Sequence, residues 1–531
     1  MKAVRSLGIV LSFGVVKCLF AGIDIAPIDA SADRNITGLD VGLRRTGTLR
    51  PRGSREIASS HFMIDCGTID RDFVDFEEIK DYLEPLGLKK ARIQAGWAKC
   101  ERVKGRYDFA WLDRIVDWLR KNGIGVYLEL SYGNPLYEGA GGPSLGGGLP
   151  SSKEGLAAWD RWVEAVARHF AGRVDEWEIW NEPDKHDPQK VVALHIRSAR
   201  ILKSVDRFAH LNAFAFADSW ADEKSVARAK SFLSLLGADS GLFETLSIHA
   251  YMPNPDWAYP NLFPSRQRIL DELGLEMKIR QGESGAPSDW LQELNLRGRA
   301  WTEVSQAKWD MRRMIGDVGN GYESDVFHIC DMVYNDDRFH RINKKGLLRA
   351  NGDKRVIQVK KAYYAVQNVA SVFDDEVVPV QNPVFRTDDL SISAYQFMRR
   401  GSLPMFCFWS HGPMERRPDG TFAIRRDMMP SDSFSTRLIT FDWQGEKLSA
   451  PVWVDLFSGA VYEFPEKWQI VHSTGVTFVN VPVYDSPCLI APRDAIFIDS
   501  YMHDRFIPDC KRRSVASPEV DGSHLISSRQ D

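Results

Sequence analysis

The chain lacks most features of the specialised protein classes. Its net charge is only −4 over 531 residues, so it offers no strong field to a polyanion, and no nucleic-acid partner is expected. Its seven cysteines form no CxxC pair and no Cys/His cluster, which removes the usual signs of a zinc site or a disulfide framework. We therefore expect no metal or cofactor and mostly buried free thiols. No apolar run is long enough for a membrane span.

The N-terminus carries a short apolar segment with a basic start. Lys2 and Arg5 precede an apolar run from Leu7 to Phe20, which Lys17 interrupts. This pattern is typical of a secretory signal peptide, so residues 1–22 are predicted to direct the chain to a secreted or periplasmic location. The alternative is a start codon placed too early, in front of a cytoplasmic protein.

Strand and helix patterns alternate strictly over residues 58–372. The predicted strands are 62–66, 90–94, 125–130, 176–180, 213–217, 245–249, 277–281 and 326–330. The predicted helices are 74–86, 109–121, 153–170, 189–205, 223–236, 266–273, 302–318 and 356–372. Eight such units predict an α/β fold, a (β/α)8 TIM barrel. An open doubly wound sheet is the alternative, but no Gly-x-Gly-x-x-Gly turn follows a predicted strand.

The regions on either side of the predicted barrel have a different character. Residues 23–57 form a polar N-terminal extension, in which residues 42–53 suggest a loop or a strand that pairs elsewhere. Short alternating runs separated by turn residues fill 373–497 and predict a C-terminal β-sandwich. From about residue 498 the sequence is polar and aperiodic, which predicts a flexible tail.

Two glutamates follow predicted barrel strands. The apolar run Trp177–Trp180 ends in Asn181-Glu182-Pro183, and a second strand ends in Gln281-Gly282-Glu283. Parallel barrels place their chemistry at the carboxyl ends of their strands. Cleavage of a glycosidic bond needs one carboxyl group that protonates the leaving oxygen and a second that attacks or stabilises the anomeric carbon. The pair therefore predicts a glycoside hydrolase.

The order of these motifs resembles a known clan. Trp180-Asn181-Glu182-Pro183 after the fourth strand, Ile248-His249-Ala250-Tyr251 after the sixth and Gln281-Gly282-Glu283 after the seventh are similar to the clan A retaining glycoside hydrolases. The following β-sandwich makes the chain most similar to glycoside hydrolase family 39, the β-xylosidase and α-L-iduronidase family. The resemblance implies an O-glycosidase acting on an oligo- or polysaccharide, with Glu182 as acid/base and Glu283 as nucleophile.

Several residues are expected to support this pair. The resemblance implies that Asn181 hydrogen-bonds the sugar 2-hydroxyl; the alternative is a turn-forming Asn before Pro. Arg92 is expected to orient Glu283 by a charge-assisted bond, against the alternative of a surface ion pair. Tyr251 is expected to donate to Glu283. His249 is as consistent with a satisfied core histidine as with a functional one.

A further expectation concerns the pKa values of the two glutamates. Repulsion between the two glutamates should raise the pKa of whichever carries the proton. Glu129 and Glu178 lie inside strands rather than at their tips, so structural ion pairing is expected of them.

Loops at the same end of the barrel supply further candidates. Trp97, Asn134, Trp220 and Trp257 are candidate sugar contacts, although most of the sixteen tryptophans are expected in the core. The clan commonly ends strand eight with a tryptophan, where this chain has Cys330-Asp331-Met332-Val333-Tyr334. Asp331 or Tyr334 is expected to serve instead. A carboxylate there would bind hydroxyl groups of a pentose or hexose and would be poorly placed against a uronic acid.

The predicted activity is exo-cleavage of a β-linked pentose or hexose by double displacement. The long loop at residues 133–150 is expected to wall off one end of the cleft and so to favour exo action. The alternatives are an endo-acting glycanase or a transglycosylase on the same barrel, or a non-catalytic carbohydrate-binding protein.

Overall fold

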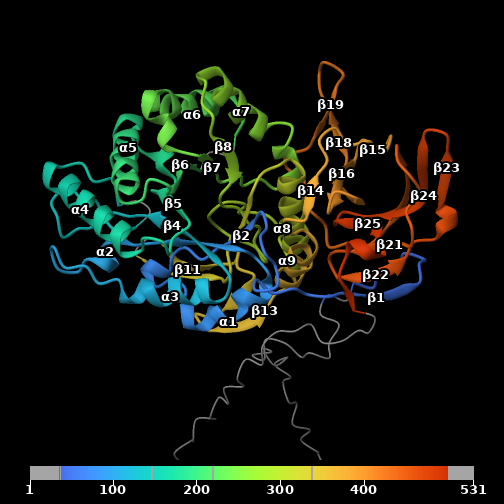
Figure 1. Cartoon of the computed structure of the whole chain (residues 1–531), viewed down its shortest axis with the longest axis horizontal. Helices are drawn as coiled ribbons and strands as arrows, with labels where there is room; N and C mark the ends of the chain where they lie inside the picture. The colour runs from blue at the N-terminus through green and yellow to red at the C-terminus, as the bar shows by residue number, and fades with distance from the viewer. Residues whose placement is uncertain (1–34, 36, 145–146, 218–219, 337–338, 500–531) are drawn as a thin grey trace, which may run out of the picture.

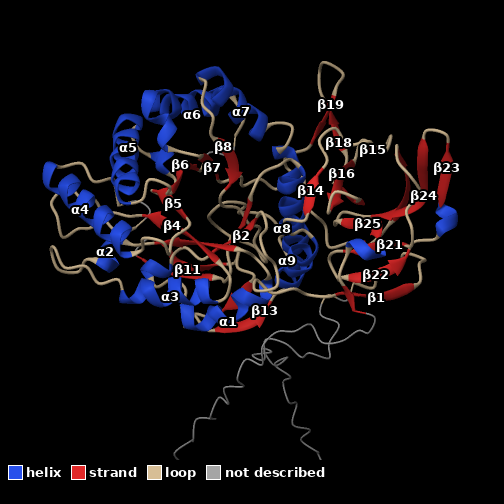
Figure 2. Ribbon diagram, in the orientation of Figure 1, coloured by secondary structure: helices blue, strands red, loops and turns tan. Residues whose placement is uncertain are grey.

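The computed structural model describes residue 35 and residues 37–499, except 145–146, 218–219 and 337–338. A barrel of strands and helices lies beside a second body of antiparallel strands (Figure 1, Figure 2). The predicted signal segment 1–22 and residues 500–531 of the predicted tail lie outside the described residues. Both therefore remain predictions.

Eight strands form a closed parallel barrel in sequence order. They are β2 (Phe62–Asp65), β3 (Lys90–Gln94), β4 (Gly125–Leu130), β5 (Glu176–Ile179), β6 (His210–Phe216), β7 (Thr245–Ile248), β8 (Lys278–Gln281) and β9 (Ser324–Val326). Strand β2 pairs with both β3 and β9 and so closes the ring. The strands are mostly buried because helices cover the outside of the barrel. The predicted (β/α)8 barrel is confirmed.

Helices alternate with these strands and cover the barrel. They are α1 (Phe76–Leu86), α3 (Ala110–Lys121), α4 (Lys153–His169), α5 (Pro188–Val205), α6 (Glu223–Leu236), α7 (Leu262–Leu273), α8 (Glu303–Gly319) and α9 (Lys361–Val372), with the short α2 (Trp97–Cys100) added after β3. Local sequence sets their ends. The Asp75 side chain accepts from the Glu77 amide at the start of α1, and Gly87, with φ 82°, ends that helix, since glycine adopts this left-handed conformation without strain.

The eighth strand lies earlier in the chain than predicted, since β9 (Ser324–Val326) shares only Val326 with the predicted strand 326–330. β9 ends at Val326, and residues 327–330 lie outside the barrel strands. Cys330 forms an isolated β-bridge with Leu348. A hairpin of β10 (Met332–Asp336) and β11 (Phe339–Asn343), absent from the prediction, follows at the carboxyl end of the barrel. This insertion brings new side chains to the rim of the barrel.

The eighth helix also begins later than predicted. Residues predicted as its first turn form β13 (Val356–Val359), which pairs with β12 (Leu348–Ala350). Three of its four residues are valine or isoleucine, whose branched side chains favour extended backbone. The helical pattern holds only from Lys361 onward.

Two antiparallel sheets form the C-terminal sandwich. The larger contains β14 (Val377–Pro379), β16 (Ile392–Arg399), β17 (Leu403–Ser410), β25 (Cys488–Pro492), β21 (Pro451–Asp455) and β22 (Ala460–Glu463), and the smaller contains β15 (Phe385–Arg386), β20 (Arg437–Trp443), β24 (Gly475–Val483) and β23 (Gln469–His472). Phe406, Trp453 and Ile490 of the larger sheet share one core with Phe385, Phe441 and Phe478 of the smaller. This shared core is that of a sandwich, so the predicted β-sandwich is confirmed. A small hairpin, β18 (Met414–Arg416) and β19 (Phe422–Ile424), projects from it.

The N-terminal extension contributes a strand to this sandwich. β1 (Arg45–Leu49) pairs with β22 on one side and with β26 (Ile498–Asp499) on the other, and Figure 1 shows it in blue among the red C-terminal strands. Of the two predictions for residues 42–53, the strand is correct. Residues 498–499, predicted as the start of the tail, form β26.

The described cysteines agree with the prediction. Cys66, Cys100, Cys330, Cys407 and Cys488 are buried free thiols. Within the described part of the chain, no helix combines the length and the apolar character needed to cross a membrane.

Candidate active site

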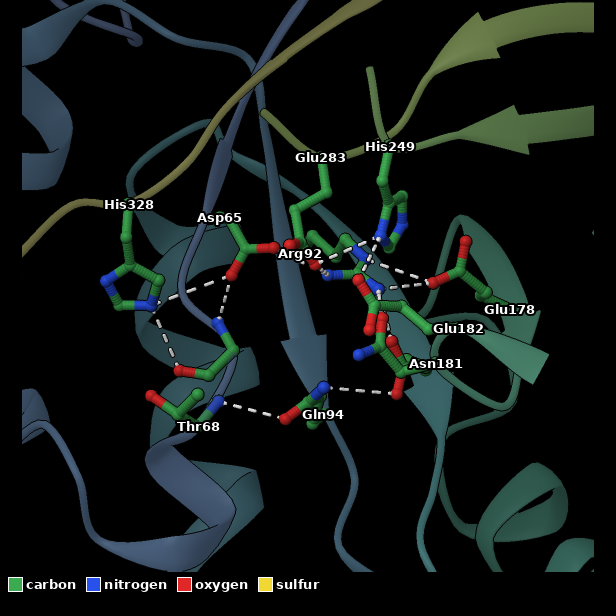
Figure 3. Close-up of polar contacts among 12 residues, drawn as sticks. Asp65, Thr68, Arg92, Gln94, Glu178, Asn181, Glu182, His249, Glu283 and His328 are labelled. Atoms are coloured by element: carbon green, nitrogen blue, oxygen red, sulfur yellow. Dashed lines mark hydrogen bonds and ion pairs between the residues drawn. The ribbon is translucent and has the colours of Figure 1, made fainter. Parts of the chain in front are cut away.

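The two predicted catalytic glutamates lie together at the carboxyl end of the barrel. Glu182 follows β5 and Glu283 follows β8, and they are 7% and 8% exposed. One carboxylate oxygen from each and one ring nitrogen of His249 all lie within 4.8 Å of one another, and Figure 3 shows these three side chains converging. Retaining glycosidases hold their two carboxyl groups about 5 Å apart, so the geometry fits a retaining pair.

A strained turn aims Glu182 at the barrel axis. Trp180 and Glu182 have φ angles of 65° and 49°, values that side chains other than glycine rarely adopt. Such residues cost on the order of 1–3 kcal/mol each and cluster at functional sites. Pro183 then begins the short helix η2 (Pro183–Lys185). The fixed φ of proline suits the first position of a helix.

Arg92 of β3 is the hub of a buried charge network. Its side chain is 1% exposed. It donates hydrogen bonds to the carboxylates of Asp65 (2.6 Å), Glu129, Glu178 (2.7 Å) and Glu283 (3.1 Å) and to the amide oxygen of Asn181 (2.9 Å). The predicted bond to Glu283 is present, and it belongs to a buried network rather than a surface pair (Figure 3). Glu129 and Glu178 form the ion pairs expected of them.

Asn181 and Tyr251 also lie where the sequence predicts. The Tyr251 hydroxyl donates to Glu283 Oε1 over 2.9 Å, and the Asn181 amide donates to the Tyr132 hydroxyl over 3.0 Å. Both side chains line the cavity above the glutamates. Asn181 is therefore held from two sides with its amide at the cavity wall, which is consistent with the predicted contact to a sugar hydroxyl.

His249 lies between the two glutamates. Its Nδ1 is 3.5 Å from Glu182 Oε1 and 3.5 Å from Glu283 Oε2, and the ring is fully buried. Burial lowers the pKa of a histidine, but here the two nearby carboxylates outweigh it and raise the pKa of His249 above its usual value. Of the two alternatives, the structure favours a functional histidine over a core one.

The pKa values of the two glutamates diverge. Burial raises the pKa of Glu283, although His249 and Arg92 oppose it. Burial also acts on Glu182, but the hydrogen bond from His249 and the ion pair with Lys185 outweigh it and hold the pKa of Glu182 to about 2. His249 first, and then the half-exposed Lys185 side chain, thus favour the charged form of the predicted acid in this geometry. Loss of the Lys185 contact would raise the pKa of Glu182 and so favour its protonated form.

We expect Lys185→Met to move the alkaline limb of the kcat/KM profile to higher pH. Removal of the cation removes a contact that favours the charged carboxylate, so the pKa of Glu182 rises. The alkaline limb reports loss of the proton from the acid in the free enzyme, so a higher pKa shifts this limb upward. Lys153→Met, at an exposed position of α4, is the matched control. An unchanged limb in Lys185→Met would show that Lys185 does not govern Glu182.

A cavity of about 430 Å³ opens above the glutamates. Its wall comes from the end of β2 and from several loops at the rim of the barrel: Asp65 of β2; Thr68, Arg71 and Phe73 after β2; Glu293, Leu294, Asn295 and Arg297 after β8; and Phe327, Tyr334, Asn343 and Lys345 after β9. Of the described residues in 133–150, none lines it. Pro143 and Ser144 of that loop line a neighbouring hollow, which shares Arg71, Phe73 and Tyr132 with the cavity. The expected wall from that loop remains a prediction, and the loops after β8 and β9 line the cavity itself.

Two predicted sugar contacts, Trp97 and Asn134, are instead structural. Trp97 is fully buried and stacks on Tyr137 and Trp162. Its indole donates to Glu101, and the Asn134 amide donates to the Glu101 carbonyl. Both side chains stabilise the loop packing around Glu101 and do not reach the described cavity wall.

Asp331 is likewise wrongly predicted as a sugar contact. Its carboxylate accepts from the Lys360 ammonium over 2.6 Å and from the Gly346 amide over 3.0 Å. It is 3% exposed and outside the cavity wall, because the chain bends away from the barrel before it. Tyr334, the other candidate, lines the cavity.

Trp220 lies on a second hollow rather than in the cavity. It is 55% exposed, and the Arg426 guanidinium stacks 3.4 Å from its ring centroid. Trp257 lies near the same guanidinium at 5.1 Å. The hollow beside Trp220 is lined by residues of the β5 and β6 loops and of α6, so neither tryptophan reaches the glutamates.

The cavity contains residues that the sequence reasoning missed. Asp65 ends β2 and could have been found by applying the strand-end rule to every strand. Lys185 follows Glu182 by one helical turn, a spacing that brings opposite charges together. Asn343 and Lys345 carried no signal, because the hairpin that presents them was not predicted.

This barrel, with one glutamate after the fourth strand and another after the seventh, has the arrangement that the resemblance to the clan A glycoside hydrolases predicts. Within that class, residues 75–197 match the model of glycosyl hydrolases family 39. The match includes Asn181 and Glu182, and it confirms the resemblance that the motifs carry.

The chain is similar to known proteins in fold and, over a shorter stretch, in sequence. A family 39 glycoside hydrolase from Bacteroides cellulosilyticus WH2 superimposes with a TM-score of 0.56 at 18% identity, covering 82% of this chain and 81% of that one. A family 30 endoxylanase from Clostridium papyrosolvens C71 gives 0.50 at 11% identity, covering 86% and 98%. A glucan 1,3-beta-glucosidase of Blumeria graminis is 31% identical over 126 residues, or 20% of this chain. The chain spans about a quarter of that relative, 26% of its length.

Proposed function

We propose that this chain is a retaining glycoside hydrolase that removes a β-linked pentose or hexose from the end of a glycan. The observation that carries the proposal is the close approach of Glu182 and Glu283, within 4.8 Å, at two strand ends of a clan A barrel. The support of Glu283 by Arg92 and Tyr251 suits a nucleophile, since both donors stabilise its charged form.

The reaction proceeds in two steps. Glu283 attacks the anomeric carbon while Glu182 donates its proton to the glycosidic oxygen, so the bond to the aglycone breaks and a glycosyl ester forms. The ester no longer carries the charge of Glu283, so repulsion on Glu182 falls. Glu182 then takes a proton from water, the hydroxide attacks the anomeric carbon, and Glu283 leaves as a carboxylate.

Exo action is supported by the walls of the cavity. Residues 293–297 after β8 and the β10–β11 insertion after β9 both rise around the glutamates and line it. Walls on two sides suit a glycan end better than an internal segment of a long chain.

Product stereochemistry and leaving-group dependence test the proposal. We expect proton NMR of the first-formed product to show retention of the anomeric configuration. In Glu182→Gln, turnover of a natural disaccharide should fall by about 10²–10⁴-fold. Turnover of an aryl glycoside whose leaving group is an acidic phenol should fall far less, because such a leaving group needs little protonation. Glu154→Gln, which removes only an exposed ion pair with Lys104, is the control. Inversion of the product, or equal losses on both substrates, would contradict the assignment.

A further inference from the structure

An exposed tryptophan at the rim of the barrel is not used by the proposed reaction. Trp220 follows β6 and is 55% exposed. It lines a hollow of about 630 Å³, the Trp220 hollow, whose other lining residues are Asp184, Ala217, Asp222, Lys224, Ser225 and Arg228. An exposed aromatic ring beside several polar side chains is typical of a ligand-binding surface.

The ring of Trp220 is held by the sandwich domain. Arg426 follows β19, and its guanidinium lies 3.4 Å from the Trp220 ring centroid, so it covers one face of the indole in a cation–π contact. The amide and the side chain of the buried Asn254 donate to the carbonyls of Arg426 and Arg425, at 3.1 and 2.9 Å. These bonds fix the segment that carries Arg426 to the loop after β7. The indole therefore has one covered face and one face that is open to the hollow.

The backbone of Trp220 is fixed as well. Its carbonyl accepts from the Ser225 hydroxyl at 2.5 Å and from the Arg266 guanidinium at 2.9 Å. Both of these donors belong to buried residues. An aromatic ring whose backbone and one face are both held loses little conformational entropy when a ligand binds.

The hollow adjoins the turn that carries the predicted acid. Arg228, which lines the hollow, donates to the carbonyls of Asp184 and His186 at 2.6 and 2.7 Å. Glu182 and Lys185 line the cavity, whereas Asp184 lines the hollow. One short segment after β5 thus separates the two spaces.

The order of the barrel strands gives the hollow a direction relative to the cavity. The strands follow one another around the ring in sequence order, so β5 and β6, whose loops contribute to the hollow, lie across the ring from β9 and β2. The insertion after β9 and the loop after β2 supply walls of the cavity. A glycan whose end is enclosed by those walls extends away from them, toward β5 and β6. The acid after β5 protonates the leaving oxygen, so the leaving part of the glycan is expected on the same side.

We propose that the Trp220 hollow is a carbohydrate-binding site outside the cavity, and that it holds the part of the glycan that leaves with the glycosidic oxygen. The apolar face of a sugar ring packs on the open face of Trp220. The exposed side chains of Asp222 and Lys224 accept from and donate to sugar hydroxyls. Arg426 is a positioning residue, since it acts on the sugar only through the indole ring. This inference rests on the proposed function and specifies that the substrate is a glycan chain longer than a disaccharide.

A series of β-linked oligosaccharides tests the site. Xylo-, cello-, laminari- and galacto-oligosaccharides are compared from the disaccharide to the hexasaccharide, in each series that the wild type cleaves. We expect KM to fall by about tenfold along the series while kcat stays within about twofold, because the added contact binds substrate and transition state alike. Trp220→Ala should remove this fall, and Trp220→Phe, which keeps an aromatic face, should retain part of it. KM for the disaccharide should change by less than about twofold in both variants.

Trp290→Ala is the matched control, because Trp290 is 53% exposed but lines a different hollow. Arg426→Ala should reduce the gain with chain length by about threefold. Its control is Arg425→Ala, since the Arg425 side chain is exposed and pairs with Asp427. A wild-type KM that does not depend on chain length, with turnover intact, would overturn the site and leave the glycosidase proposal standing. An equal effect of Trp290→Ala would also overturn it.

Binding provides a readout that is independent of turnover. Calorimetric titration of Glu283→Gln with xylohexaose, cellohexaose, laminarihexaose and galactohexaose should show tighter binding of one hexasaccharide than of its disaccharide. The Trp220→Ala change in the same background should weaken binding of that hexasaccharide by about tenfold and leave binding of the disaccharide unchanged. Equal affinities with and without the Trp220 indole, or no binding of any hexasaccharide, would overturn the site even if none of these glycans is cleaved.

Discussion

Glu283→Gln is expected to abolish turnover, with kcat reduced by on the order of 10⁴-fold or more. The amide keeps the shape of the side chain and its contacts with Tyr251 and Arg92, but it cannot form the glycosyl ester. Hydrolysis of an aryl glycoside, followed by fluorescence, measures the effect. The fold should be retained, because the change removes a charge whose burial is itself unfavourable.

A cavity-forming variant sharpens this test. In Glu283→Gly, added azide should enter the space left by the carboxylate, attack the anomeric carbon and restore part of the activity. The product would be a glycosyl azide of inverted configuration, which NMR identifies. Glu272→Gln, at an exposed position of α7 where the glutamate pairs with Lys230, is the control and should retain most of its activity. Full activity in Glu283→Gln would rule out its role as nucleophile.

Arg92→Leu is expected to destabilise the barrel by at least about 3–5 kcal/mol. Arg92 is the shared counter-ion of Asp65, Glu129, Glu178 and Glu283. Its loss leaves four carboxylates close together in a buried site, where repulsion and desolvation both oppose folding. The free energy of unfolding, from urea titration followed by tryptophan fluorescence, is the measurement.

The Arg280→Leu variant distinguishes a loss of stability from a loss of catalytic activity. Arg280 is equally buried in the barrel interior, but it pairs with Glu176 and Glu323, which do not line the cavity. We expect this variant to lose stability while each folded molecule keeps its activity. Arg92→Lys, which keeps the charge but not the five-donor fork, should fold and lose activity. Wild-type stability in Arg92→Leu would contradict the network as described.

The sequence predicted the parts of the site that depend on strand ends. Glu182 and Glu283 each follow an apolar run, and parallel strands bring such tips to one end of a barrel. Tyr251 was found for the same reason, since it follows β7. Arg92 lies instead in the middle of β3, and its side chain reaches Glu283 inside the barrel. The barrel itself followed from eight alternating patterns, because the period of the apolar residues reports which faces are buried.

The remaining residues depended on tertiary packing that no local pattern reports. Trp97 and Asn134 lie on loops at the correct end, but packing around Glu101 buries them. Asp331 is paired by Lys360, which lies 29 positions later in the chain. Lys345 follows the β10–β11 hairpin, which the sequence patterns did not predict.

The placement of β1 has a consequence for biosynthesis. This strand is synthesised before the barrel, yet its two partners, β22 and β26, are synthesised after it. Domains fold largely in order of synthesis, so the barrel can close while the larger sandwich sheet still has an incomplete edge. Until then β1 exposes an unpaired edge, the kind of surface that holding chaperones protect. The larger sandwich sheet is therefore completed only after the barrel has been synthesised, and loss of either β1 or β26 would remove a strand from the same sheet.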